Sequence, residues 1–499
     1  MRRIFLIGAA WVVLGACGGP EPDRAPRLVL LYAPCTVNAE FVAPYGDATY
    51  TPRLKDFAAQ SVVFERHMTE DGQSGPAYAS IFSGRQSDGH GVFYHPADVS
   101  SAEGPWLTEV FRNGGFYVAA WLQHMMASPE LGYGRGAHEQ HMAVPDSDTP
   151  ELMQLLAGLR DDPSSRALVV VNHILVHSPF RLVALEPFCD AHPWECNVLR
   201  DEPERFYSFV HMYRDLDAKL QRDFPAVVAE RGLSDDDVAF LARVVQVLYR
   251  SNLWQLDAHF GRLLDAVAMY GLEEESLVVF TADHGEVFYR EDLLFPFTHG
   301  FQLAPEVLRV PLLIRGKSLE PRRYEAVTRS TDLLPTLASL AGIAPPKLPD
   351  QPWNGVDLAA AIRGDSPEPD LEAYSHTAVV AGAVSEASAD WHHFRRYYPR
   401  TDPTLMWTQV RVGDELLQLR GVLDDDDMLD MKPVHYRLST SGRLDIAMPE
   451  RALAMQRRAR LDVYLESLIA AWEEKVASGD EGLGKEREKE LLKALGYVD

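Results

Sequence analysis

Positive charge is scarce in this chain of 499 residues. Lysine and arginine together number 48, against 73 aspartate and glutamate residues, which gives a formal net charge of -25. Nucleic acid and anionic bilayer surfaces would repel such a protein, so neither is expected as a charge-driven partner. Hydrophobic residues make up 46% of the chain, enough for one large core and a smaller appended unit, so disorder is not the default expectation.

Long apolar runs are also missing after the first sixteen residues. Arg2 and Arg3 precede the apolar stretch Ile4–Leu14, which is shorter than a membrane-spanning helix. This pattern is typical of a signal peptide over residues 1–16 that is removed from the mature protein. No later stretch of about twenty apolar residues follows, so the sequence predicts no further membrane span.

The end of this segment resembles the lipobox of bacterial lipoproteins. It reads Leu14-Gly15-Ala16-Cys17. The resemblance implies that Cys17 becomes the acylated N-terminus, that residues 17–26 form a tether, and that the protein is anchored to a membrane in the cell envelope. An ordinary cleaved signal or an uncleaved anchor, with Cys17 incidental, remains the alternative.

Cysteine is rare, with four residues in the whole chain. Cys189 and Cys196 lie close together in a polar segment with proline, and an envelope compartment permits disulfides. We therefore expect a local bridge between them. Cys35 is then left without a disulfide partner.

Short apolar runs of strand length alternate with helix-like stretches over the first three quarters of the chain. This alternation predicts a three-layer α/β domain over residues 27–370 with a mostly parallel central sheet. A smaller C-terminal α+β subdomain is expected over residues 371–499. In such sheets the functional residues lie just beyond the carboxyl ends of the strands. The expected strands are Arg27–Tyr32, Ala167–Val171, Leu277–Thr281 and Val310–Ile314, and the expected helices are Pro52–Gln60, Leu107–Asn113, Leu253–Met269, Leu333–Leu340 and Pro449–Lys475.

The strongest chemical signal follows the third expected strand. Asp283 and His284 stand directly after it, and Gly285 permits a tight turn. A carboxylate oxygen and an imidazole nitrogen suit a divalent metal ion. Taken alone, Asp283 capping a helix and His284 packing in the core would explain the same residues.

The motif does not stand alone. The stretch Asp283-His284-Gly285-Glu286 resembles the metal-binding element of the sulfatase family, within the alkaline phosphatase-like superfamily. The resemblance implies an alkaline phosphatase-like fold and a metal-dependent hydrolase of sulfate or phosphate esters, acting on a small molecule or a glycan. It extends through His299-Gly300, Glu306–Ile314, Asp332–Leu337, Gly342-Ile343, Asn354–Leu358 and Leu492–Val498.

Ser74 falls at the family's nucleophile position, at the start of an expected helix. A metal ion and the helix N-terminus would both polarise its hydroxyl. Sulfatases proper convert this residue to formylglycine, which depends on a following proline and arginine. Pro76 is present, but Tyr78 stands in the arginine position. An unmodified Ser74 suits a phosphatase or phosphotransferase, and a simple N-cap serine is the structural alternative.

Cys35 falls where the family ends its first strand with an acidic metal ligand. A thiolate at this position would favour zinc over calcium or magnesium, because hard cations prefer oxygen. A buried thiol that packs and binds nothing is the alternative.

Two histidines complete the site that the resemblance implies. His177, in a His-x-Pro-aromatic pattern, and His299 match positions that contact the transferred anion or the leaving group, which is work that a histidine can do near neutral pH. Near His124 the family's Gly-Lys-Trp-His element is not reproduced. Because of these departures, a catalytically impaired protein that binds envelope glycans or a protein partner remains a second hypothesis.

Overall fold

The computed structural model describes residues 25–46, 48–222, 224–289, 296–300, 303–379, 404–412, 415–423, 429–438, 444–446 and 451–477. The predicted signal peptide, Cys17 and most of the tether lie outside these residues. None of the helices in the described ranges combines the length and apolar character needed to cross a bilayer.

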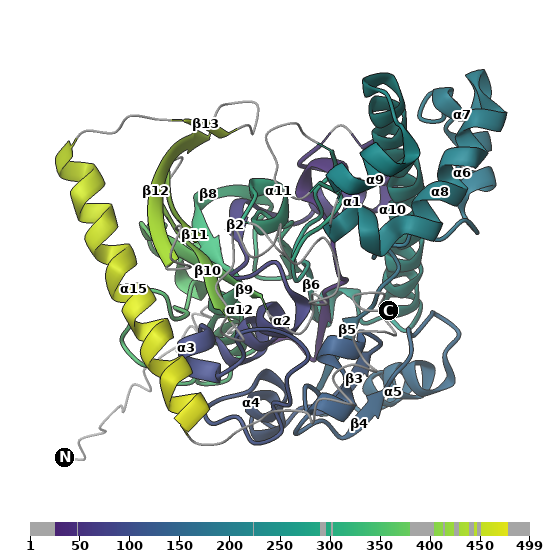
Figure 1. Ribbon diagram of the computed structural model, residues 1–499. Coiled ribbons are helices and arrows are strands. Elements are labelled where there is room, and N and C mark those ends of the chain that lie inside the picture. Colours follow the sequence, from purple (N-terminus) through teal and green to yellow (C-terminus); the bar gives the residue numbers. More distant parts are fainter. Residues whose placement is uncertain are drawn as a thin grey trace, which may run out of the picture.

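An eight-stranded sheet forms the centre of the molecule (Figure 1). Its order is β4-β3-β5-β1-β6-β7-β2-β8, and only β7 runs antiparallel to its neighbours. This confirms the predicted fold class. The strands are β1 (Leu28–Tyr32), β2 (Val62–Met68), β3 (Tyr117–Leu122), β4 (Glu139–His141), β5 (Ala167–Asn172), β6 (Ser276–Phe280), β7 (Leu313–Gly316) and β8 (Arg322–Arg329).

Both faces of the sheet are buried, as the short strand β1 illustrates. Its residues Leu28, Leu30 and Tyr32 enter one hydrophobic core, while Val29 and Leu31 enter a second core on the opposite face. Successive side chains of a strand point to opposite faces, so a strand that is apolar throughout needs a layer of helices on each side. This explains the three-layer arrangement.

Helix α10 is longer than its predicted range. The long helix α10 begins 18 residues before the expected Leu253–Met269, and a capping box of Ser234 and Asp237 fixes its start. The helices of the main domain are α1 (Pro52–Ala58), α2 (Ser74–Ser83), α3 (Ser87–His90), α4 (Leu107–Asn113), α5 (Pro150–Asp161), α6 (Leu185–Ala191), α7 (Asn197–Asp201), α8 (Pro203–Arg222), α9 (Phe224–Arg231), α10 (Asp235–Met269), α11 (Pro305–Leu308), α12 (Leu333–Leu340) and α13 (Ala359–Arg363).

A second, antiparallel sheet follows in the C-terminal part. Its order is β13-β12-β11-β10-β9, and the helix α15 (Arg451–Ala477) packs against β10 and α3 along its side (Figure 1). The strands are β9 (Glu372–Val379), β10 (Thr404–Val412), β11 (Glu415–Leu423), β12 (Leu429–Leu438) and β13 (Leu444–Ile446).

The predicted bounds of one strand, Val310–Ile314, are wrong. The apolar run Val310–Ile314 predicts a strand, but β7 spans Leu313–Gly316 and the run begins in the turn after α11. Val310 still bonds through its amide to the His67 carbonyl at 3.1 Å, so the run is buried without being a continuous strand. A buried loop and a buried strand have the same apolar composition.

Candidate active site

Loops at one edge of the central sheet bring the predicted site residues together. Cys35 follows β1, His177 follows β5, and Asp283 and His284 follow β6. Ser74 is the first residue of α2, after β2. All five side chains are buried. Carboxyl ends of strands that run in the same direction meet at one edge, which explains how positions so distant in sequence converge.

Ser74 contacts two of these side chains directly. Its Oγ lies 3.1 Å from His284 Nε2 and 3.4 Å from Cys35 Sγ. His284 Nδ1 donates to the Gly285 carbonyl oxygen at 2.9 Å, which leaves the lone pair on Nε2 to accept from the Ser74 hydroxyl. Gln73, not Ser74, is the N-cap of α2, so the serine hydroxyl is directed at the site and does not serve as a cap.

Asp283 has one oxygen fixed by the backbone and one available. Its Oδ1 accepts from the amides of Thr36 at 3.1 Å and His284 at 2.7 Å. Its Oδ2 accepts no hydrogen bond from the described residues and lies 3.5 Å from His284 Nε2. Gly285 is required here, because a Cβ atom would lie 1.9 Å from the Glu306 carbonyl oxygen. The backbone thus fixes Oδ1 of Asp283 and leaves Oδ2 beside His284.

Cys35 lies on a strained turn beside Asp283. Its Sγ is 3.8 Å from His284 Nε2, and burial together with the negative charge of Asp283 raises the pKa of the thiol well above its usual value. The next residue, Thr36, has a positive φ of 59°, which is unfavourable for a β-branched residue. The hydroxyl of Thr36 donates to the Val176 carbonyl at 2.7 Å and helps to hold the turn. Strain of this kind concentrates at functional sites.

His177 and His299 lie next to this group. The His177 and His299 ring centroids are 5.1 Å apart, and the His299 ring stacks on His284 at 4.5 Å. Burial lowers the pKa of each of these two histidines to about 4, so both are neutral near pH 7. Nδ1 of His177 bonds to the Ser178 carbonyl, which leaves Nε2 as a buried acceptor without a hydrogen-bond partner among the described residues.

Glu286 supports His299 from the side. Its Oε2 accepts from His299 Nδ1 at 3.1 Å, and burial raises the pKa of Glu286 to about 7. The sequence motif contains this glutamate, but nothing in the pattern assigns it a role.

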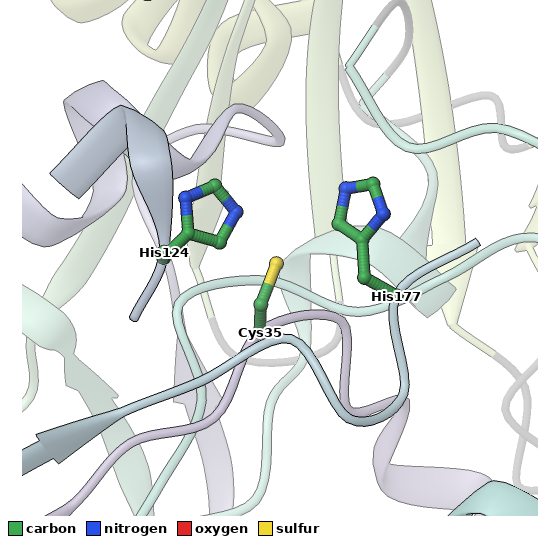
Figure 2. Close-up of side chains that lie close together, drawn as sticks. All are labelled: Cys35, His124 and His177. Atoms are coloured by element: carbon green, nitrogen blue, oxygen red, sulfur yellow. The ribbon is translucent and has the colours of Figure 1, made fainter. Parts of the chain in front are cut away.

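His124 is a site residue that the sequence motifs did not assign. It follows β3, is buried, and lies on the opposite side of Cys35 from His177, with the sulfur directed between the two rings (Figure 2). Nδ1 of His124 accepts from the Met126 amide at 3.1 Å, so the neutral ring carries its proton on Nε2. The sequence signal that could have identified His124 is its position two residues after the end of β3.

The C-terminal sheet holds two loops of the site in place. From β9, the Ser375 hydroxyl donates to the Thr69 carbonyl at 3.0 Å, and the His376 amide donates to the Glu70 carbonyl at 3.0 Å. Thr377 donates to the Gly300 carbonyl at 2.8 Å. The first two bonds fix the segment before Ser74, and the third fixes the residue after His299. The second sheet is therefore a structural support for the active-site loops.

Glu70 makes this support sensitive to pH. Burial raises the pKa of Glu70 from 4.5 to about 8, and Oε2 has no hydrogen-bond partner among the described residues. The folded state therefore prefers the neutral acid, so its stability is greatest below pH 4.5 with respect to this group and is lost as the pH rises through about 8.

Glu70→Gln removes this titration. We expect thermal melts to show a variant close to the wild type at pH 5 and more stable by about 4 kcal/mol at pH 9. Glu320→Gln, on the surface, is the matched control and should show no such pH dependence. An unchanged difference at the two pH values for Glu70→Gln would contradict the burial argument.

Comparisons with known proteins identify the family of this chain. The profile of the Sulfatase family matches residues 197–343. Choline-sulfatase from Rhizobium meliloti is 29% identical over 447 residues, which cover 78% of this chain and 83% of that protein. Arylsulfatase A from Bos taurus is 33% identical over 421 residues, covering 79% of this chain and 80% of the relative. The chain belongs to the sulfatase family.

A solved structure that is not named as a sulfatase shows the same fold. The phosphonate monoester hydrolase of Agrobacterium radiobacter aligns with a TM-score of 0.58 at 16% identity, covering 90% of this chain and 96% of that one. At this identity the likeness concerns the fold alone. It places the sulfatase-family chain in a fold shared with a phosphorus-ester hydrolase.

Tyr78 lies one helical turn after Ser74 on α2. Its ring is fully buried on α2, and its hydroxyl donates to the Ala33 carbonyl at 2.7 Å. No guanidinium group can occupy this position in the present chain.

Proposed function

We propose that this sulfatase-family chain hydrolyses sulfate or phosphate esters with the unmodified hydroxyl of Ser74 as the nucleophile. The observation that carries the proposal is the contact of 3.1 Å between Ser74 Oγ and the unprotonated Nε2 of His284, at the N-terminus of α2. The helix N-terminus favours the developing negative charge on the serine oxygen. Tyr78 in place of an arginine supports an unmodified serine.

The residues fit a divalent cation, as the family resemblance implies. One donor atom each from Cys35, Asp283 and His284 lies within 4.8 Å of the others, and Asp283 Oδ2 is buried without a hydrogen-bond partner among the described residues. Among those residues, no lysine or arginine forms an ion pair with Asp283. A cation bound there would lower the free energy of the serine alkoxide and of the transferred group.

The reaction would proceed in two substitutions. The Ser74 oxygen attacks sulfur or phosphorus, its proton passes to His177 Nε2, and the bond from sulfur or phosphorus to the alcohol oxygen breaks. Water then attacks the sulfur or phosphorus of the group carried by Ser74, and the Ser74 oxygen leaves and regains a proton. His177, neutral at pH 7 with a lone pair on Nε2, can accept a proton and pass it to the departing oxygen. Nε2–H of His124 is a donor for an anionic oxygen.

We further propose that the protein works in the cell envelope, anchored through Cys17, on a sulfated or phosphorylated small molecule or glycan. The lipobox-like sequence supports the anchor. The bridge between Cys189 and Cys196, with an S–S distance of 2.07 Å, suits an oxidising compartment.

A panel of aryl sulfates, aryl phosphates and aryl monoesters of phosphonates tests the function, with protein purified from its native compartment. We expect turnover of at least one ester class and, by peptide mass spectrometry, a serine at position 74. An aldehyde at this position would replace the proposed nucleophile by formylglycine. Absence of turnover on all three classes, with the metal bound, would favour a binding protein for envelope glycans or a protein partner.

A further inference from the structure

Cys35 is the common member of two groups of metal-binding side chains. One group joins Cys35 with Asp283 and His284, and the other joins it with His124 and His177. In both groups the donor atoms lie within 4.8 Å of one another, and all five side chains are buried. Because one thiolate cannot by itself define a site, the partners decide which group can hold an ion.

The hydrogen bonds of the histidines distinguish the two groups. His284 donates from Nδ1 to Gly285, so its Nε2 carries the lone pair, and Nε2 lies 3.8 Å from Cys35 Sγ. His124 uses its Nδ1 lone pair to accept from the Met126 amide, so its Nε2 carries a proton and cannot bind a cation without losing that bond. The second group, whose side chains are drawn in Figure 2, therefore lacks one imidazole lone pair.

The remaining donors are one sulfur, one carboxylate oxygen and one imidazole nitrogen. Calcium takes six to eight oxygen ligands and magnesium demands an octahedron of oxygens, and neither requirement is met by a single carboxylate. Zinc binds sulfur, nitrogen and oxygen with four ligands, and catalytic zinc sites have three protein ligands and one open position.

We propose that this site binds a soft divalent cation of the zinc type through the Cys35 thiolate, Asp283 Oδ2 and His284 Nε2. This inference rests on the proposed function, because it names the cation of the same site. Ser74 Oγ lies 3.4 Å from Sγ and 3.1 Å from Nε2, so the serine hydroxyl borders two of the proposed donors. A bound cation would take the Nε2 lone pair and would replace His284 as the group that polarises the Ser74 hydroxyl.

The surrounding backbone supports these ligands. The Gly285 carbonyl fixes the tautomer of His284, and the Thr36 amide fixes the Asp283 carboxylate. Outer contacts of this kind orient metal ligands in proteins. The turn with the positive φ at Thr36 lets the Thr36 amide donate to Asp283 Oδ1 and leaves the donor atoms of Cys35 and Asp283 within 4.8 Å of each other.

Cobalt substitution tests the thiolate ligand without relying on turnover. Adding Co²⁺ to the metal-free protein should produce the near-ultraviolet charge-transfer band that marks a bond between cobalt and a thiolate sulfur. Zn²⁺ should abolish the band by competition. Cys35→Ser should lack it and should bind Zn²⁺ about 100-fold more weakly or worse. Cys35→Asp should lack it and gain affinity for Ca²⁺ or Mg²⁺.

His124→Gln is the matched control for the ligand set. This variant should keep the cobalt band, because His124 is not a ligand in the proposed site. Circular dichroism of each variant confirms that it is folded. Absence of the band in the folded wild type, or its loss in His124→Gln, would overturn the proposed ligands.

The outcomes separate this inference from the proposed function. A cobalt–thiolate band in a protein that turns over no ester keeps the zinc-type site and contradicts the hydrolase. Turnover that requires Ca²⁺ or Mg²⁺, without any thiolate band, keeps the hydrolase and overturns the zinc-type site.

Discussion

Replacing Ser74 by alanine is expected to lower kcat/KM by about 1,000-fold or more, with little loss of stability. The variant removes the only protein atom proposed to form a bond with sulfur or phosphorus, and nucleophile deletions of this kind have effects of that order or larger. Binding of the substrate should persist, because the cation and the histidines remain. Initial rates on the best ester of the panel provide the measurement.

Ser80→Ala is the matched control for this variant. Ser80 lies on the same helix and is equally buried, but its hydroxyl bonds to His90 at 3.2 Å, away from the reacting group. Loss of one such hydrogen bond costs about 1 kcal/mol of stability and should leave kcat/KM close to the wild-type value. Equal activities of the Ser74 and Ser80 variants would exclude Ser74 as the nucleophile.

Asp283→Asn is expected to weaken cation binding by about 100-fold or more and to lower turnover in parallel. The asparagine oxygen can still accept from the Thr36 and His284 amides, so the turn should persist. What is lost is the negative charge and the second oxygen as a ligand. Elemental analysis and isothermal titration with Zn²⁺ measure the change directly.

Asp257→Asn separates this effect from a general effect of losing a buried carboxylate. Asp257 accepts from the amides of Arg53 and Leu54 at 3.0 and 2.7 Å, at the start of α1 and away from Ser74. Its variant should lose stability but keep its metal content. A full complement of metal in Asp283→Asn would show that Asp283 is no ligand.

The sequence predicted the position of the site because of the way in which parallel strands end. The apolar strands β1, β5 and β6 are short and easily recognised, and Cys35, His177 and Asp283 follow them within a few residues. Once the fold class is known, these residues must lie at one edge of the sheet. Ser74 could be added because a resemblance to a known motif placed it there.

What the sequence could not predict are contacts that depend on tertiary structure. The proton of His124 is placed by the Met126 amide, and the same residues in another turn would give the other tautomer. The support of the Ser74 loop by β9 joins Thr69 with Ser375, positions with no local pattern in common. By contrast, the first half of α10 has buried apolar residues at helical spacing, such as Val238, Leu241 and Val245, so its start at Asp235 could have been predicted from the sequence.

The pH response of the support is likewise a property of the fold. Glu70 has an ordinary sequence context, and burial raises the pKa of its carboxyl to about 8 even though the hydrogen bond from the Thr331 amide acts in the opposite direction. No pattern of neighbouring residues would distinguish it from a surface glutamate.

The most direct measurement of the central claim is the mass of the Ser74 peptide after rapid acid quenching during turnover. The account predicts a serine that carries one additional sulfuryl or phosphoryl group in the quenched sample and a plain serine in the resting protein. An aldehyde at position 74, or continued turnover with this peptide never modified, would contradict it.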